Sequence, residues 1–218
     1  MKKYLFAMLT LVSLTAAAQG KFDIQNFDGF TVHVYQPSDS QTSGSLIVES
    51  RSGLVVLEPS KDEAFKDYLE RFTKPVVQTP DANAPGTIQN WNGVEMAFRM
   101  SLYGASGTDV IVGRSLYYVH NLPSKAHATL QEVSKPEDID EQLNKVAILL
   151  NSNCSKFVDV HGDVYDESLL RFLKKYYGAM KKVYKKSHDA KGFYDAMYYA
   201  FPDLKGEDAL RQVAQSLY

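Results

Sequence analysis

The chain has 218 residues, of which 44% are hydrophobic and 23% are charged, and its formal net charge at pH 7 is −2. These values are typical of a globular protein long enough to bury a full core. They lack the strong positive charge that favours nucleic acid or an anionic membrane surface, so we expect no nucleic-acid partner. The single cysteine, Cys154, excludes an internal disulfide, and we expect it to be buried beside Leu149 and Phe157.

The first 18 residues are typical of a secretory signal peptide. Lys2 and Lys3 precede an apolar run over residues 4–14, and three alanines at 16–18 supply small residues for cleavage. The run is shorter than the roughly 20 residues that span a membrane, and no cysteine follows it to carry a lipid. We therefore expect export to the periplasm or beyond the cell, with no membrane anchor after cleavage. Loss of the two lysines changes the net charge from −2 to −4, and residues 19–218 form one expected domain.

The beginning of the mature chain reads mainly as strands. Residues 22–30 are expected to be irregular, and residues 31–36 alternate as a half-buried strand. A polar loop over 37–44 follows. The apolar runs 46–48 and 54–57 are joined by a Ser-Gly turn and predict a hairpin.

A helix is expected after this hairpin. Ser60 is a suitable N-cap with Glu63 three positions later, which is the spacing of a capping box. Lys74 and Pro75 end the helix, and a strand over residues 75–79 returns to the sheet. A helix that crosses between two strands implies that they are parallel. The apolar face of this helix comprises Ala64, Phe65, Tyr68, Leu69 and Phe72.

The rest of the chain changes from strands to helices. We expect strands over residues 91–102, 109–112, 115–119 and 156–160, and helices over 136–150, 166–186, 192–200 and 206–217.

The predicted helix over 166–186 carries many lysines outside its apolar stripe. A solvated helix face explains them, while an interaction module that binds an anionic partner is the alternative. Binding of that kind would weaken with salt. The lysines are Lys174, Lys175, Lys181, Lys182, Lys185 and Lys186.

Two segments carry a family resemblance. Residues 45–77, SLIVESRSGLVVLEPSKDEAFKDYLERFTKPVV, contain a strand, a glycine turn, a strand ending in an acid, a helix and Lys-Pro-Val. Residues 155–184, SKFVDVHGDVYDESLLRFLKKYYGAMKKVY, contain VHGD before a long helix with an aromatic pair, and FPDL follows. In this order and spacing, residues 32–217 resemble metallo-β-lactamase-fold proteins of the metallo-hydrolase superfamily. The resemblance implies an α/β (α+β) fold, a four-layer αββα sandwich of two mixed β-sheets.

The resemblance also implies a zinc motif, which this chain lacks. The family has His-x-His-x-Asp-His after the strand that matches PVVQT, because imidazoles and carboxylates on one loop hold zinc ions that acidify a bound water. The matching positions here are Pro80, Ala82, Ala84 and Pro85, none of which binds a metal. Where the family commonly has Gly-Asp, residues 113–115 read Gly-Arg-Ser. The resemblance therefore implies a lost dinuclear zinc site.

Some polar residues remain where the resemblance implies a cleft. His161 in VHGD matches the last ligand of the family, and Glu58 stands where the family often has an outer acid. His120 follows another predicted strand, while Asp81 and Asn83 lie in the loop after residues 75–79. His161, His120 and Glu58 are thus the catalytic candidates. His161, His120 and Asp81 are the candidates for a residual metal site.

Aromatic residues near predicted strand ends are a further set of candidates. They either line a binding cleft or pack in the core. We retain Trp91 as a candidate ligand contact together with Asp81, Asn83, His120 and His161. The aromatic set is Tyr35, Trp91, Tyr103, Tyr117 and Tyr118.

Two hypotheses of function remain open. In the first, this is an exported, non-catalytic binding or structural relative of the metallo-hydrolases, without a cofactor, whose partner is a small molecule or a protein. In the second, it is a divergent hydrolase with a mononuclear zinc or metal-free site that uses His161 and His120 as ligands or general bases. Metal content and the relative position of these two histidines distinguish the hypotheses.

Overall fold

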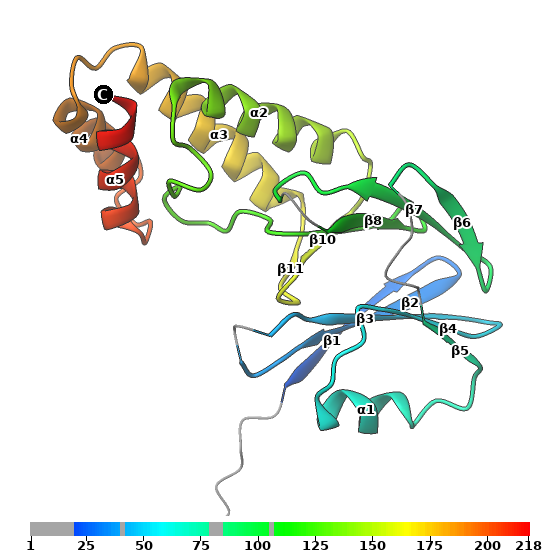
Figure 1. Ribbon diagram of the computed structural model, residues 1–218. Helices are drawn as coiled ribbons and strands as arrows, with labels where there is room; N and C mark the ends of the chain where they lie inside the picture. Colours follow the sequence, from blue (N-terminus) through cyan, green and yellow to red (C-terminus); the bar gives the residue numbers. More distant parts are fainter. Residues whose placement is uncertain (1–19, 40–41, 79–84, 105–106) are drawn as a thin grey trace, which may run out of the picture.

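The computed structural model describes residues 20–39, 42–78, 85–104 and 107–218. These residues form two sheets and five helices (Figure 1). Sheet A has the order β1-β2-β3-β4-β5, and sheet B has the order β11-β10-β9-β8-β7-β6. The strands of sheet A are β1 Lys21–Phe27, β2 Phe30–Gln36, β3 Ser45–Ser50, β4 Leu54–Leu57 and β5 Val76–Gln78. Those of sheet B are β6 Ile88–Trp91, β7 Val94–Met100, β8 Thr108–Val112, β9 Leu116–Val119, β10 Lys156–Asp159 and β11 Val164–Tyr165.

The helices cover the outer faces of the two sheets. They are α1 Glu63–Leu69, α2 Pro136–Leu150, α3 Glu167–Tyr184, α4 Ala190–Ala200 and α5 Glu207–Leu217. Helix α1 covers sheet A, whereas α2 and α3 cover sheet B, and α4 and α5 extend the helical layer beyond the end of that sheet (Figure 1). In the described part of the chain, no helix is both long and apolar enough to cross a membrane.

Three apolar clusters fill the spaces between these layers. One joins sheet A to α1 around Phe65, and a second lies between the two sheets and includes Met96. The third joins sheet B to the helices around Phe157 and Leu173. The succession of helix, sheet, sheet and helix confirms the four-layer αββα sandwich of two mixed sheets.

The centre of sheet A agrees with the sequence. Strands β3 and β4 form the predicted hairpin, with Leu46 opposite Leu57. Strands β4 and β5 pair in parallel, with Leu54 opposite Val76, because α1 makes the crossover between them. All four residues of β4 are buried, as expected for a central strand covered on both faces.

The prediction of an irregular segment over residues 22–30 is wrong. Residues Lys21–Phe27 form β1, which pairs antiparallel with β2. The turn between them contains Asp28 and Gly29, and Gly29 has a φ of 82°. Asp-Gly is a strong hairpin signal, but the largely exposed β1 has only a short apolar alternation, at Phe22 and Ile24, to accompany it.

The predicted capping box before α1 is also wrong. The helix begins after Asp62, whose side chain makes no capping hydrogen bond, and it ends at Leu69. The Ser60 hydroxyl accepts a hydrogen bond from the Asp62 backbone N–H at 3.1 Å. The Ser60 side chain therefore hydrogen-bonds a backbone N–H in the turn before the helix, and it does not cap the first turn of the helix.

The strand predicted over residues 91–102 is shorter, because β7 runs from Val94 to Met100. Trp91 instead ends a separate strand, β6, and Asn92 and Gly93 form the turn between the two at φ values of 52° and 85°. Asn-Gly favours the left-handed conformation that a tight hairpin requires. Burial of Cys154, which is 7% exposed, is confirmed.

Candidate functional site

The ends of several strands meet at one edge of the sandwich. Strands β9 and β10 are parallel, so the residues that follow them, His120 and His161, lie at the same edge. Asp109 lies in β8, near its start, and β8 runs antiparallel to β9, which brings Asp109 to this edge too. Glu58 directly follows β4 of the opposite sheet.

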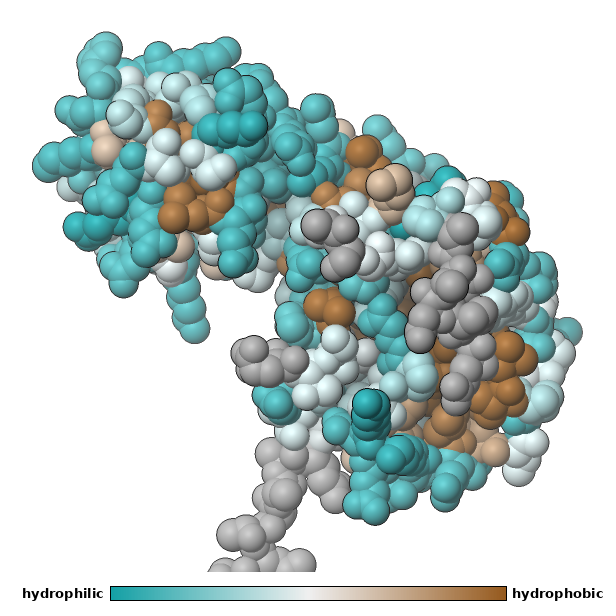
Figure 2. All heavy atoms as spheres, in the orientation of Figure 1, coloured by the Kyte–Doolittle hydropathy of each residue, from teal (hydrophilic) through white to brown (hydrophobic). Residues whose placement is uncertain are grey.

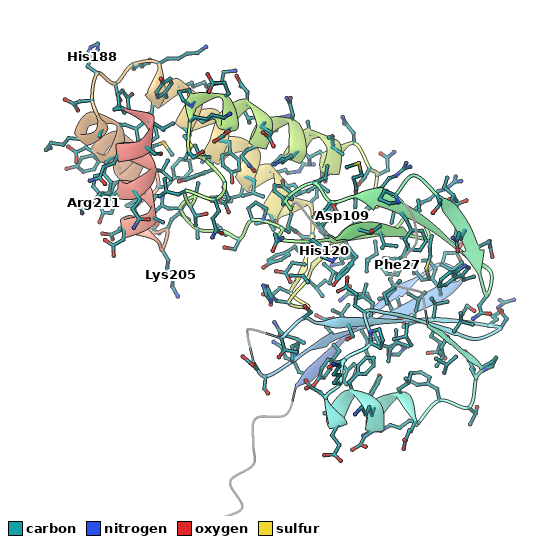
Figure 3. The ribbon with its side chains drawn as sticks, in the orientation of Figure 1. Phe27, Asp109, His120, His188, Lys205 and Arg211 are labelled. Atoms are coloured by element: carbon teal, nitrogen blue, oxygen red, sulfur yellow. The ribbon has the colours of Figure 1, made fainter. Side chains whose placement is uncertain are left out.

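Three of these side chains and that of Tyr118 form a carboxylate–imidazole cluster, comprising Glu58, Asp109, Tyr118 and His120. One carboxylate oxygen of Glu58 lies 2.8 Å from Nε2 of His120, and the other accepts a hydrogen bond from the Tyr118 hydroxyl at 2.6 Å. Nδ1 of His120 lies 3.3 Å from a carboxylate oxygen of Asp109 (Figure 3). The cluster therefore joins sheet A to sheet B through Glu58.

Asp109 is the fully buried carboxylate of the cluster, with 0% exposure. Its carboxylate accepts hydrogen bonds from the backbone N–H of Leu102 at 3.0 Å and of His120 at 2.9 Å. A buried carboxylate is expensive unless it is paired and hydrogen-bonded, and Asp109 has both kinds of partner. It fixes the loop after β9 and orients the imidazole.

The electrostatics of the cluster favour a charged imidazole. Hydrogen bonds to Asp109 and then Glu58 outweigh burial and raise the pKa of His120 to about 9. Burial would raise the pKa of Glu58, but hydrogen bonds from His120 and Tyr118 overcome this effect and lower it. At neutral pH, His120 is therefore an imidazolium between two carboxylates.

The backbone of Glu58 has an uncommon conformation. Its φ is 49°, in the left-handed region that non-glycine residues rarely adopt. The Ser45 hydroxyl donates a hydrogen bond of 2.6 Å to the Glu58 carbonyl oxygen. Strain of this kind costs on the order of 1–3 kcal/mol and persists only where surrounding contacts impose it. Here the contacts direct the Glu58 carboxylate toward sheet B.

This donor set does not fit a zinc ion. Both ring nitrogens of His120 face carboxylates, so zinc could bind the ring only by displacing a proton and one of these two contacts. Across residues 20–39, 42–78, 85–104 and 107–218, no group of three or more His, Cys, Asp or Glu residues is arranged to hold a metal ion.

His161 shares the edge with the cluster but is not part of it. Its side chain is exposed, and its backbone N–H donates to the Asp159 carboxylate at 2.9 Å. Among the described side chains, no hydrogen bond or ion pair connects the His161 ring to the cluster. The following Gly162 has a φ of 84°, and a Cβ there would lie 2.6 Å from the Tyr35 carbonyl oxygen. VHGD therefore forms a tight turn against sheet A.

The remaining sequence candidates lie elsewhere or outside the described residues. Trp91 pairs with Val94 at the opposite end of sheet B from His120, and its ring lies 6.2 Å from that of Phe98. The expectation that Trp91 lines this edge is therefore corrected, because the Asn-Gly turn places it at the other end of the sheet. Asp81 and Asn83 lie outside the described residues.

The lysines of α3 partly engage in packing. Lys181 forms an ion pair with Asp140 of α2, and Nζ of Lys175 lies 5.9 Å from the centre of the Phe201 ring. Figure 2 shows hydrophilic residues over most of the visible surface of the helical end of the molecule. The hydrophilic surface of this end of the molecule favours a solvated helix face.

Comparisons with known proteins give distant structural neighbours and no relative by sequence. No family model matches the chain, and no curated protein matches its sequence. Among solved structures, the DIM-1 metallo-β-lactamase exposed to ceftazidime has a TM-score of 0.49 at 11% identity, over 72% of this chain and 95% of that chain.

Two diiron proteins resemble the structure of this chain to a comparable degree. The chemotaxis sensor ODP in a peroxy diiron form has a TM-score of 0.47 at 10% identity, over 72% of this chain and 93% of that chain. A variant of the flavo di-iron protein from Thermotoga maritima has a TM-score of 0.44 at 11% identity, over 90% of this chain and 77% of that chain. From its own sheets, strand order and helical layers, the chain has the metallo-β-lactamase-like αββα architecture that its sequence resemblance implies.

Proposed function

We propose that this protein is an exported, metal-independent binding protein that has kept the metallo-hydrolase architecture without the zinc chemistry. The carboxylate–imidazole cluster then serves as a structural clamp between the two sheets. Its partner is a small molecule or another protein.

The observation that carries this proposal is the state of His120. Its two ring nitrogens face Glu58 at 2.8 Å and Asp109 at 3.3 Å. With both nitrogens donating, the ring has no free lone pair, and it must lose a proton before it can bind a metal or act as a general base. His161 is exposed, and among the described residues its ring forms no hydrogen bond or ion pair with His120 of the cluster.

One feature favours the alternative of a divergent hydrolase. The left-handed backbone at Glu58 holds a carboxylate at the edge where the resemblance implies the former metal site. A zinc ion that displaced a proton from His120 would find a neutral imidazole and the Glu58 carboxylate at this edge.

Metal content of the mature protein tests the proposal. The protein is purified without chelator, analysed by mass spectrometry, and then titrated with zinc while its melting temperature is followed. We expect no stoichiometric metal and no increase in melting temperature, in the wild type and in His161→Ala alike. One equivalent of zinc in the wild type that is absent from His161→Ala would overturn the proposal and favour the hydrolase. Mass analysis of the exported chain checks removal of the first 18 residues.

A further inference from the structure

A pocket of about 260 Å³ lies between α4 and α5, at the helical end of the molecule (Figure 1). Each helix lines it with one face, because side chains at positions i, i+3 and i+4 of a helix lie side by side. Arg211, labelled in Figure 3, projects from α5 toward Tyr194 of α4. The lining comprises Ala190, Lys191 and Tyr194 of α4 and Arg211, Ala214 and Gln215 of α5.

The inner part of this pocket is apolar. Ala214 is 1% exposed and Ala190 is partly buried, so two methyl groups occupy positions that larger side chains would fill. The Tyr194 ring stacks on that of Tyr198, with 6.0 Å between the ring centres and 12° between the ring planes. An aromatic ring held in this way gives the pocket a fixed apolar wall. The space between the helices therefore suits the apolar part of a ligand.

Arg211 brings a positive charge to this pocket without an acid to pair with it. Its guanidinium carbon lies 4.9 Å from the centre of the Tyr194 ring, a cation–π contact that positions the group. Glu207 and Asp208 precede it by about one turn of α5, yet no ion pair joins either of them to Arg211 in the described structure. The Arg211 side chain is exposed, so a ligand can reach its N–H groups.

The other charges near the pocket already have partners. Lys191, the second base in the lining, is paired with Asp195 at 2.5 Å. Asp189 lies outside the lining and caps α4, where its carboxylate accepts a hydrogen bond from the Gly192 backbone N–H at 2.7 Å. The lining itself contains two bases and no acid. Arg211 therefore provides one positive charge that an anionic ligand can neutralise.

We propose that this pocket binds a small monocarboxylate with an apolar or aromatic body, of about the size of benzoate. The carboxylate accepts two parallel hydrogen bonds from the guanidinium of Arg211, whose fork of donors matches two oxygen atoms. The body of the ligand packs against Ala190, Ala214 and the Tyr194 ring. Pockets for drug-sized ligands have volumes of about 300–1,000 Å³, so a volume of about 260 Å³ limits the ligand to a compact one.

The test is a titration with benzoate at constant ionic strength, followed by NMR of the ¹⁵N-labelled protein. Benzamide has a similar shape without the charge, and benzylamine carries the opposite charge. We expect saturable shifts of the Lys191 and Ala214 backbone amide signals with benzoate, with a Kd on the order of 1 mM, and at least tenfold weaker binding of both controls. No saturable shift of these signals up to about 50 mM benzoate, or equal affinity for benzamide, would overturn the proposal.

An arginine variant separates recognition of the charge from folding. Arg211→Gln changes an exposed side chain, so its melting temperature should stay close to that of the wild type. Its affinity for benzoate should nevertheless fall about tenfold, the equivalent of ~1.4 kcal/mol. Arg171→Gln replaces an exposed arginine of α3 outside the lining, and this matched control should bind benzoate as the wild type does. Unchanged affinity in Arg211→Gln would contradict the proposed site.

A second variant distinguishes the pocket from attraction to Arg211 alone. Ala190→Leu keeps the charge of Arg211 but places a larger side chain in the lining, so we expect the saturable benzoate shifts to disappear. Wild-type affinity in Ala190→Leu would show that the carboxylate binds outside the pocket and would overturn the proposal.

None of the lining residues belongs to the carboxylate–imidazole cluster, so this proposal does not rest on the metal-free role of that cluster. Zinc binding would overturn the proposed function while leaving the benzoate titration unchanged. Failure of the benzoate titration would leave the metal analysis unchanged in turn.

Discussion

Raising the pH should remove a large part of the stability that the carboxylate–imidazole cluster provides. Folding raises the pKa of His120 from its ordinary value of 6.5 to about 9. The protonated ring therefore stabilises the fold fully below about pH 6.5, and this contribution is lost as the pH rises through about 9. At about 1.4 kcal/mol per pH unit, this shift corresponds to roughly 3 kcal/mol of unfolding free energy. The His120 side chain is 12% exposed, so solvent screens it little.

The assay compares urea unfolding of the wild type and His120→Gln between pH 6 and pH 10. The variant keeps hydrogen-bonding capacity but cannot become charged. We expect the wild type to be more stable at pH 7, with this advantage shrinking by about 2–3 kcal/mol by pH 10. Lysine and tyrosine ionisation affects both proteins, so it cancels in the difference. Parallel profiles with a constant difference would refute the charged state of His120.

Three substitutions and one labelling experiment test further features of the structure. Glu58→Gln should cost about 1–2 kcal/mol, a value reduced by the 40% exposure of the carboxylate, and should lower the pKa of its imidazole partner in an NMR titration. Gly162→Ala should cost about 2–4 kcal/mol in urea unfolding, because its φ is 84° and the new Cβ would meet the Tyr35 carbonyl oxygen. Gly178→Ala in α3, where a Cβ meets nothing within 4 Å, should instead gain about 0.5–1 kcal/mol, and equal losses in both would contradict the account. Burial raises the pKa of the Cys154 thiol, so iodoacetamide should modify it only after unfolding; rapid native modification detected by mass spectrometry would contradict its burial.

The sequence predicts the helices and central strands because their patterns are local. Apolar residues at helical spacing define α2, and four consecutive apolar residues define β4. The exposed edge strand β1 has only a short alternation at Phe22 and Ile24, so its Asp-Gly turn is the clearer signal. Edge strands depend on pairing with a neighbour more than on their own burial.

The candidate site was only partly predictable. Glu58 and His120 follow strands and could be placed at one edge, and the structure joins them. Asp109 has no motif, and its role depends on antiparallel pairing that places it beside the end of β9. His161 matches a family position, yet an exposed turn residue and a cluster member look alike in sequence. Side-chain direction at a strand end is decided by packing.

The protonation state of the His120 ring at pH 7 tests the central claim most directly. Long-range ¹H–¹⁵N NMR, before and after one equivalent of zinc, reports the state of both ring nitrogens. The two carboxylate contacts predict that both nitrogens carry protons and that zinc leaves their shifts unchanged. A neutral ring, or a zinc-dependent shift of one nitrogen, would contradict the account and show that this edge still offers a metal ligand.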